Sequence, residues 1–167
     1  DERILQRCVN KSKCLPIYAY DQKNAQFIGY EGEIKTTLAE TRFGQLKLTL
    51  FSDYVRGKFS DGDVPRMPPL RYGAEIGFGD SIWNSALRYT HGDNQNKAGL
   101  NESDTKNYHL LTASTDYQLK SFGSLDLWLF AKGSNLFNQE IRSSVSFLRN
   151  FAPEPGRSIV LGLRAIF

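Results

Sequence analysis

The sequence predicts an all-β fold, an antiparallel transmembrane β-barrel segment without substantial helix. Apolar and polar residues alternate along most of the chain, as in strands with one face on hydrocarbon and the other on water. Aromatic residues make up 13% of the chain, although its mean hydropathy is only −0.43. No stretch approaches the roughly 20 consecutive apolar residues of a transmembrane helix. A membrane-resident chain of this kind must therefore close a sheet.

Three predicted strands lie in the first half of the chain. The run 15–38, with a possible break at the polar residues 21–24, alternates isoleucine, tyrosine and leucine with charges in its second half. The run 46–56 alternates leucines with polar residues, and the run 70–79 alternates bulky residues with Arg, Gly and Glu. This period of two is the signature of a half-buried strand.

Four further strands are predicted in the second half, which gives about seven in all. The run 82–90 carries Trp, Leu and Tyr on one parity, 105–119 is less regular, and 125–134 alternates leucines with polar residues. The run 158–167 is apolar on one parity and ends on Phe167. None of these runs has a sustained helical period.

Alternation alone also fits a soluble sandwich, for which 167 residues could supply a sizeable core. Two features favour the membrane barrel. Short connections at 39–45, 80–81 and 120–124 alternate with longer ones between the other strands, as periplasmic turns alternate with extracellular loops. Aromatic residues also fall near strand ends on the apolar parity, as in an interfacial girdle. They are Tyr30, Tyr54, Trp83, Tyr89, Tyr117 and Phe167.

The direction of the strands follows by counting back from the last one. If Phe167 lies at the periplasmic end, the connection 135–157 and the segment around Cys8 are extracellular. An even-stranded barrel then needs at least one more strand ahead of Asp1, so the sequence is expected to be truncated. Cys8 and Cys14 are separated by five residues, a spacing that favours a small disulfide loop over half a zinc site.

The net charge of +3 is mild and shows no basic run typical of nucleic-acid binding. The charges on the polar parity include both signs and are predicted to face the lumen of the barrel. They could contact a plug or simply solvate the wall with weak cross-strand pairs. The eleven residues are Glu31, Glu33, Lys35, Lys47, Asp53, Arg71, Glu75, Arg88, Asp126, Lys132 and Arg164.

Several short motifs occur in an order that resembles the C-terminal barrel of TonB-dependent outer-membrane receptors over nearly the whole chain. Asp53-Tyr-Val-Arg-Gly57, with Pro155-Gly-Arg-Ser158, Asn138-Gln-Glu-Ile-Arg142 and Ser146-Phe-Leu148, is most similar to the zinc-uptake branch. The other matching pieces are Asn24–Glu33, Pro65–Pro69, Gly133–Phe137 and Leu161–Phe167.

The resemblance implies that residues 1–167 are the C-terminal portion of a barrel of about 22 strands, whose N-terminal plug is absent from this sequence. It implies energy-coupled import of a scarce nutrient, zinc or another metal, across the outer membrane of a Gram-negative bacterium. It implies no cofactor beyond zinc as a possible cargo. The implied partners are outer-membrane lipid, the plug and remaining strands, the TonB complex, and the barrel-assembly machinery, for which Phe167 would be the signal.

Two groups of polar residues are candidates for metal binding or catalysis. His91, Asp93, Asp104 and His109 lie in or beside one connection and could hold Zn²⁺ loosely, although an ordinary polar loop is the better explanation of this spacing. Ser103 and Ser114 lie near His109 in sequence, but no pattern joins them into a nucleophile and base. The sequence therefore predicts no enzyme.

The connection 135–157 is rich in phenylalanine and arginine, so it is expected to be ordered by packing among the loops or to cover the barrel mouth. A small stand-alone outer-membrane barrel with a structural or adhesive role is the alternative function.

Overall fold

The structure, a computed structural model, describes residues 5–10, 13–17, 22–123 and 125–167. All regular secondary structure in these ranges is β-strand, and they contain no helix that could span a membrane. The strands are β1 (Leu5–Asn10), β2 (Lys13–Ile17), β3 (Gln26–Thr41), β4 (Gly44–Phe59), β5 (Gly62–Asp63), β6 (Arg71–Gly79), β7 (Trp83–Gly92), β8 (Tyr108–Phe122), β9 (Leu125–Ser134) and β10 (Ser158–Ile166).

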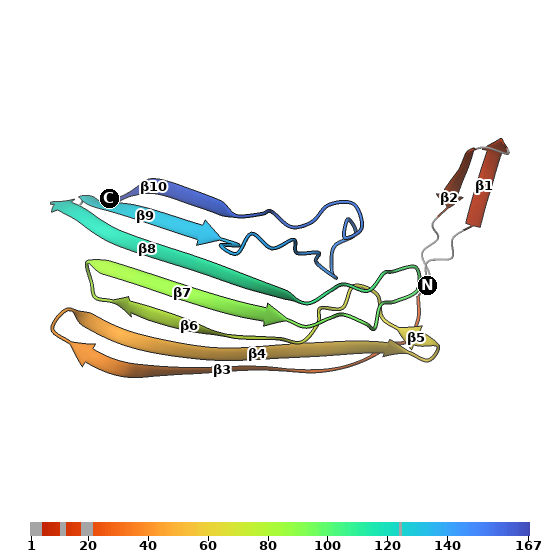
Figure 1. Ribbon diagram of the computed structural model, residues 1–167, viewed down its shortest axis with the longest axis horizontal. Helices are drawn as coiled ribbons and strands as arrows, with labels where there is room; N and C mark the ends of the chain where they lie inside the picture. The colour runs from red at the N-terminus through yellow and green to blue at the C-terminus, as the bar shows by residue number, and fades with distance from the viewer. Residues whose placement is uncertain (1–4, 11–12, 18–21, 124) are drawn as a thin grey trace.

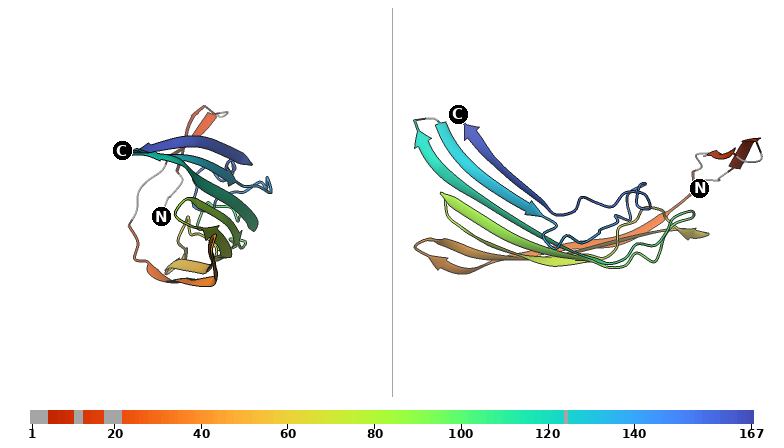
Figure 2. Two further views of the ribbon diagram at one scale, coloured as in Figure 1. Left: turned by 90° about the vertical axis from the view of Figure 1, so that its left-hand side faces the viewer. Right: turned by 45° about the horizontal axis from the view of Figure 1, so that its top comes forward.

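Seven long strands form one antiparallel sheet in the order β10-β9-β8-β7-β6-β4-β3, with the short β5 paired to the end of β4 (Figure 1). β1 and β2 form a separate hairpin. Figure 2 shows that the main sheet curves like a section of a cylinder wall. Within the described ranges, β3 and β10 each have a strand on one side only, so the sheet has two open edges.

The connections separate by length to the two ends of the sheet. Short turns join β3 to β4, β6 to β7 and β8 to β9 at one end, and the segments 60–70, 93–107 and 135–157 lie at the other (Figure 1). This is the predicted alternation of short and long links. The C-terminus lies at the end with the short turns, whereas the β1-β2 hairpin lies beyond the opposite end.

The predicted all-β antiparallel fold is confirmed, and each of the seven predicted runs overlaps one long strand, although only β9 has the predicted bounds. The run 15–38 is divided, because its first residues belong to β2, and 18–21 lie outside the described residues. β8 begins at Tyr108 rather than residue 105, because Thr105 forms an isolated bridge with Gln95. A register shift after Gln118 carries β8 on to Phe122.

The described residues do not enclose the sizeable core that a soluble sandwich would have. Ile141 is the only buried hydrophobic side chain among the described residues, and it lies in a connection. A single-layer sheet has nothing against which to pack its apolar side, so Ile28 and Leu161 are each 72% exposed. We call this side the apolar face. It carries Ile28, Tyr30, Ile34, Leu50, Tyr72, Ile76, Trp83, Leu87, Tyr89, Tyr117, Leu129, Ile159, Leu161 and Leu163.

Candidate functional site

The opposite side of the sheet is the charged face, and the strand registers place all eleven predicted lumen-facing charges on it. The register aligns Glu31, Asp53 and Arg71 across three strands, and Lys35 and Glu75 lie four residues further along. Successive residues of a strand point to opposite faces, so these side chains share one surface. That this surface lines a lumen remains a prediction.

Ion pairs of moderate exposure connect the charged face. Arg71 donates from Nε and Nη2 to Asp53 Oδ1, at 3.0 and 2.8 Å. Arg88 Nη1 lies 3.3 Å from Glu75 Oε2, while its guanidinium lies 3.7 Å from the centre of the Phe51 ring. Exposed pairs of this kind contribute about 0–1 kcal/mol each. They suit a wet wall or a surface that meets another polar surface better than they suit a stability core.

Asp116, which is not among the eleven predicted charges, also belongs to the charged face. Its Oδ1 accepts a hydrogen bond of 3.0 Å from Arg164 Nη2, although Arg164 belongs to β10 and Asp116 to β8. The two strands are both neighbours of β9, so the bond spans an intervening strand. Only the strand order reveals this partner, since the residues are 48 positions apart.

The three long connections pack against one another at one end of the sheet. The guanidinium of Arg149 pairs with Glu102 Oε1; the Arg149 side chain is buried, and the Glu102 side chain is only 11% exposed. Glu102 Oε2 accepts the backbone N–H groups of Arg66 at 2.9 Å and Gly99 at 3.2 Å. One carboxylate therefore joins segments from all three connections.

Further polar groups strengthen the packed loops. Gln95 Nε2 donates to the carbonyl of Met67 at 2.8 Å, and Ser144 Oγ donates to the same carbonyl at 3.0 Å. Asn135, which is 2% exposed, has a positive φ of 49° and donates to the carbonyls of Gln139 and Pro155. Asparagine tolerates this left-handed conformation better than most residues. Packing among the loops therefore explains why the connection 135–157 has a defined conformation.

The aromatic residues of the connection 135–157 point outward rather than into this packing. Phe137 is 56% exposed, Phe147 is 73% exposed and Phe151 is 84% exposed, whereas Arg149 is 5% exposed. Phenylalanine is usually buried and arginine exposed, but here the reverse holds. The arginine can be buried because it has a carboxylate partner. The guanidinium of Arg66 covers one ring, at 4.1 Å from the centre of Phe147.

The four predicted metal-site residues are only partly brought together. His91 and His109 lie directly opposite each other on β7 and β8, with 3.2 Å between their Nδ1 atoms. Asp93 Oδ1 lies 3.0 Å from His91 Nε2. No described contact connects Asp104 with them, and no group of three His, Cys, Asp or Glu side chains in the described ranges is arranged to hold a metal. Metal binding remains a prediction.

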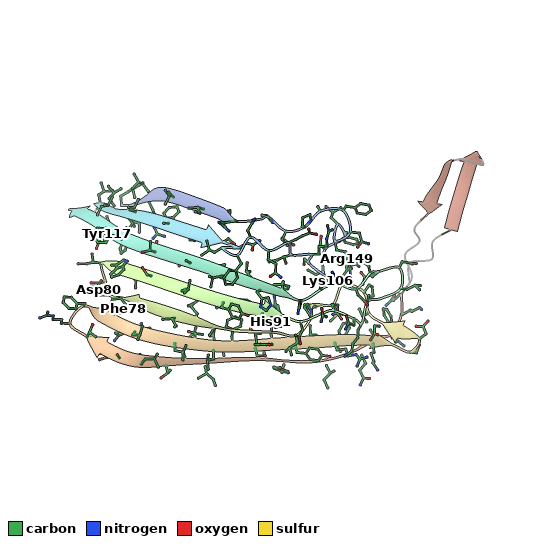
Figure 3. The ribbon with its side chains drawn as sticks, viewed as in Figure 1. Phe78, Asp80, His91, Lys106, Tyr117 and Arg149 are labelled. Carbon is green, nitrogen blue, oxygen red and sulfur yellow. The ribbon has the colours of Figure 1, made fainter. Side chains whose placement is uncertain are left out.

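The sequence did not predict which aromatic residues lie beside the histidine pair. The Tyr89 hydroxyl lies 2.7 Å from His109 Nδ1, and the Tyr72 ring lies 5.0 Å from the His91 ring. Figure 3 shows His91 toward the end of the sheet with the long connections, with Phe78 and Tyr117 toward the other end. Aromatic rings thus occur near both ends of the apolar face.

The serines considered for catalysis do not approach a base. Ser103 Oγ donates to Asn150 Oδ1 at 2.6 Å. Ser114 lies on the opposite face of the sheet from His109, because the two residues on β8 differ in parity. The hydrogen-bonding partners of His109 Nδ1 are Tyr89 and His91.

Two terminal predictions concern the disulfide and the assembly signal. The backbone register places Cys8 opposite Cys14 in the β1-β2 hairpin, but their side chains lie outside the described residues. The Cys8–Cys14 disulfide therefore remains a prediction. Phe167 follows β10 and is 95% exposed, which leaves its ring available to a partner; its assembly role also remains a prediction.

Two aspartates outside the long strands have pKa values held below the usual range. Asp80 Oδ1 accepts the backbone N–H groups of Trp83 at 2.8 Å and Ile82 at 2.7 Å, and these bonds lower its pKa. The pKa of Asp61 is lowered by its hydrogen bond from Lys23. The first arrangement fixes the short turn between β6 and β7 and thereby the register of two strands.

No family model matches the chain, and neither does any curated protein. Among the solved structures that it resembles is a copper transporter, OprC, with a TM-score of 0.75 over 99% of this chain. The two sequences are 17% identical, and this chain spans 26% of the length of that one. At this identity the likeness shows the fold alone. The chain has the fold of an antiparallel segment of an outer-membrane β-barrel.

Proposed function

We propose that the chain forms part of the barrel wall of an outer-membrane TonB-dependent receptor that imports a metal ion or metal complex. The observation that carries this proposal is the two-faced, single-layer sheet with open edges. Its apolar face has no packing partner among the described residues, and its other face carries charges of both signs. A closed barrel places such faces against lipid and an aqueous or protein-filled lumen.

The open edges support a larger barrel rather than a closed barrel of this segment alone. β3 and β10 are at opposite edges of the curved sheet, and edge strands in lipid leave backbone groups without partners. Pairing with further strands would satisfy both edges. The match to about a quarter of a longer transporter agrees with this arrangement.

The charged face contacts the plug in this proposal, and the packed loops form part of the extracellular rim. Pairs such as Asp53 with Arg71 and Glu75 with Arg88 leave both partners partly exposed, so they can exchange hydrogen bonds with a polar plug or with water. The role of this segment is therefore structural support of transport, without catalysis. Energy would come from the TonB complex through other parts of the receptor.

The substrate class follows from two similarities. The motifs around Asp53 and Asn138 are most similar to the zinc-uptake branch, and the structural neighbour is a copper transporter. We assign a transition metal or its complex as the class, with zinc as the first ion to test and copper as the second. The location in this proposal is the outer membrane of a Gram-negative bacterium.

The test uses the full-length protein in its own bacterium. Zinc and copper accumulation at limiting concentrations should fall several-fold when the gene is deleted, and equally when TonB is removed. The native polypeptide in the outer-membrane fraction should be several times heavier than the 18.9 kDa of this chain. A native species near that mass would reject the transport proposal and favour a small structural or adhesive barrel. Normal accumulation of both metals after deletion would reject metal import.

A further inference from the structure

The side chains of His91 and His109 meet directly across two neighbouring strands. The residues are register partners on β7 and β8, with ring centres 4.7 Å apart and planes inclined by 42°. Their Nδ1 atoms are 3.2 Å apart. Because both residues belong to regular strands of one sheet, the backbone holds this arrangement in place.

One tautomer of the pair places two nitrogen lone pairs opposite each other. Asp93 Oδ1 accepts from His91 Nε2 at 3.0 Å, which directs the lone pair of neutral His91 to Nδ1. His109 Nδ1 faces both this lone pair and the Tyr89 hydroxyl, which lies 2.7 Å away. If the hydroxyl donates to His109, two nitrogen lone pairs face each other at 3.2 Å. A cation between them removes that repulsion.

The spacing of the two nitrogens suits a transition metal. A tetrahedral ion with metal–nitrogen bonds of about 2.0–2.1 Å separates two of its nitrogen ligands by about 3.3 Å. The observed 3.2 Å therefore needs no movement of either strand. The Tyr89 hydroxyl would turn away from the His109 lone pair and would remain close enough to hydrogen-bond a water molecule on the metal.

The surroundings match those of a histidine ligand. The His91 side chain is 11% exposed, whereas that of Asp93 is 48% exposed, so the ring is held while the carboxylate reaches solvent. A carboxylate that accepts the second N–H of a ligating histidine fixes its tautomer and raises its basicity. Imidazole ligands suit copper, nickel and zinc, and the general order of affinity favours Cu²⁺.

We propose that His91 and His109 bind a divalent transition-metal ion through their Nδ1 atoms, with Asp93 as the positioning residue and water at the remaining positions. The site lies on the apolar face near the long connections, not on the charged face. It therefore does not rest on the proposed transport function, and it would hold metal at the rim outside any passage through the barrel.

The test titrates Cu²⁺ and then Zn²⁺ into metal-free full-length protein in detergent, with electron paramagnetic resonance for copper and calorimetry for both. His91→Gln and His109→Gln should each remove one bound ion per protein, or lower the affinity of the protein for that ion at least tenfold. Each should also reduce the copper signal from two coordinated nitrogens to one or none. Asp93→Asn should weaken binding about 10–100-fold, whereas Asp104→Asn should leave it unchanged.

Circular dichroism and heat-dependent gel migration show that each single variant is folded before titration. Unchanged stoichiometry and nitrogen coupling in both folded histidine variants would overturn the proposal, as would the absence of any ion that responds to these substitutions. Metal uptake in cells is measured separately. Loss of the site with normal uptake supports a rim site. A site that is present in a protein whose deletion leaves metal accumulation normal rejects the transport proposal alone.

Discussion

Arg149 and Glu102 form a buried ion pair between connections that are 47 residues apart in sequence. Their side chains are 6% and 11% exposed. The same carboxylate accepts backbone N–H groups from Arg66 and Gly99, and the backbone carbonyl of Ser103 accepts a hydrogen bond from Arg149. Each charge has its partners, so the cost of desolvation is offset within the cluster.

We expect Arg149→Met to loosen the three connections by about 3–5 kcal/mol, because it leaves the Glu102 carboxylate buried without its cation. Hydrogen exchange at 93–107 and 135–157 measures this loss of protection. Arg157→Met is the matched control, since the described contact of Arg157 uses its backbone N–H. Equal exchange in both variants would contradict the role of the pair, and adding Glu102→Gln to Arg149→Met should restore part of the protection.

The turn at Asp80 should respond to pH. Its carboxylate is stabilised by two backbone N–H groups, so the folded pKa lies below the ordinary 3.8. The stabilisation is present above the unfolded pKa and is lost as pH falls through the lowered folded pKa. The Trp83 amide signal in nuclear magnetic resonance should therefore titrate below pH 3.8. In Asp80→Asn, which keeps an oxygen acceptor, this titration should disappear; its persistence would assign the effect to another group.

Strand positions could be predicted from the sequence because alternation is a local property. The Leu125–Ser134 strand has the predicted bounds, and the Trp83–Gly92 strand differs from its prediction by one residue at the start and two at the end. The start of β8 could not be predicted, because Thr105 is engaged by Gln95 across the connection. That pairing depends on how a loop folds back, which periodicity does not encode.

The contacts of the candidate sites depend on strand register and loop packing, so most of them could not be predicted from the sequence. His91 and His109 are separated by a 15-residue connection, and only the pairing of β7 with β8 brings their rings together. Composition predicted packing among the loops or a cover over the barrel mouth for the connection 135–157, but it did not identify the partner of Arg149, which comes from a different connection. The parity of the charged face, by contrast, followed directly from strand alternation.

Removal of Phe167 should lower the amount of folded full-length receptor in the outer membrane several-fold. The residue follows β10 and is 95% exposed, so its deletion removes little packing within this sheet. A large effect would therefore indicate recognition during assembly. Phe167→Trp keeps a terminal aromatic ring and should retain near-normal levels. Quantification of the heat-modifiable form in outer-membrane fractions measures the outcome, and unchanged levels after deletion would count against the assembly role.

The two faces of the sheet should meet different solvents, and adjacent residues of one strand test this at nearly the same depth. Glu75 and Ile76 lie on β6, on the charged face and the apolar face. The test uses full-length protein reconstituted in lipid, with the native cysteines replaced by serine. A spin label at Glu75→Cys should collide with a water-soluble nickel chelate more often than a label at Ile76→Cys does. The label at Ile76→Cys should collide with oxygen, which concentrates in hydrocarbon, more often than the label at Glu75→Cys does.

Lys47→Cys and Leu48→Cys on β4 provide a second matched pair and should repeat the contrast. Equal collision with the chelate at both positions of each pair would mean that the apolar face is not in lipid, because hydrocarbon excludes a charged or strongly polar complex.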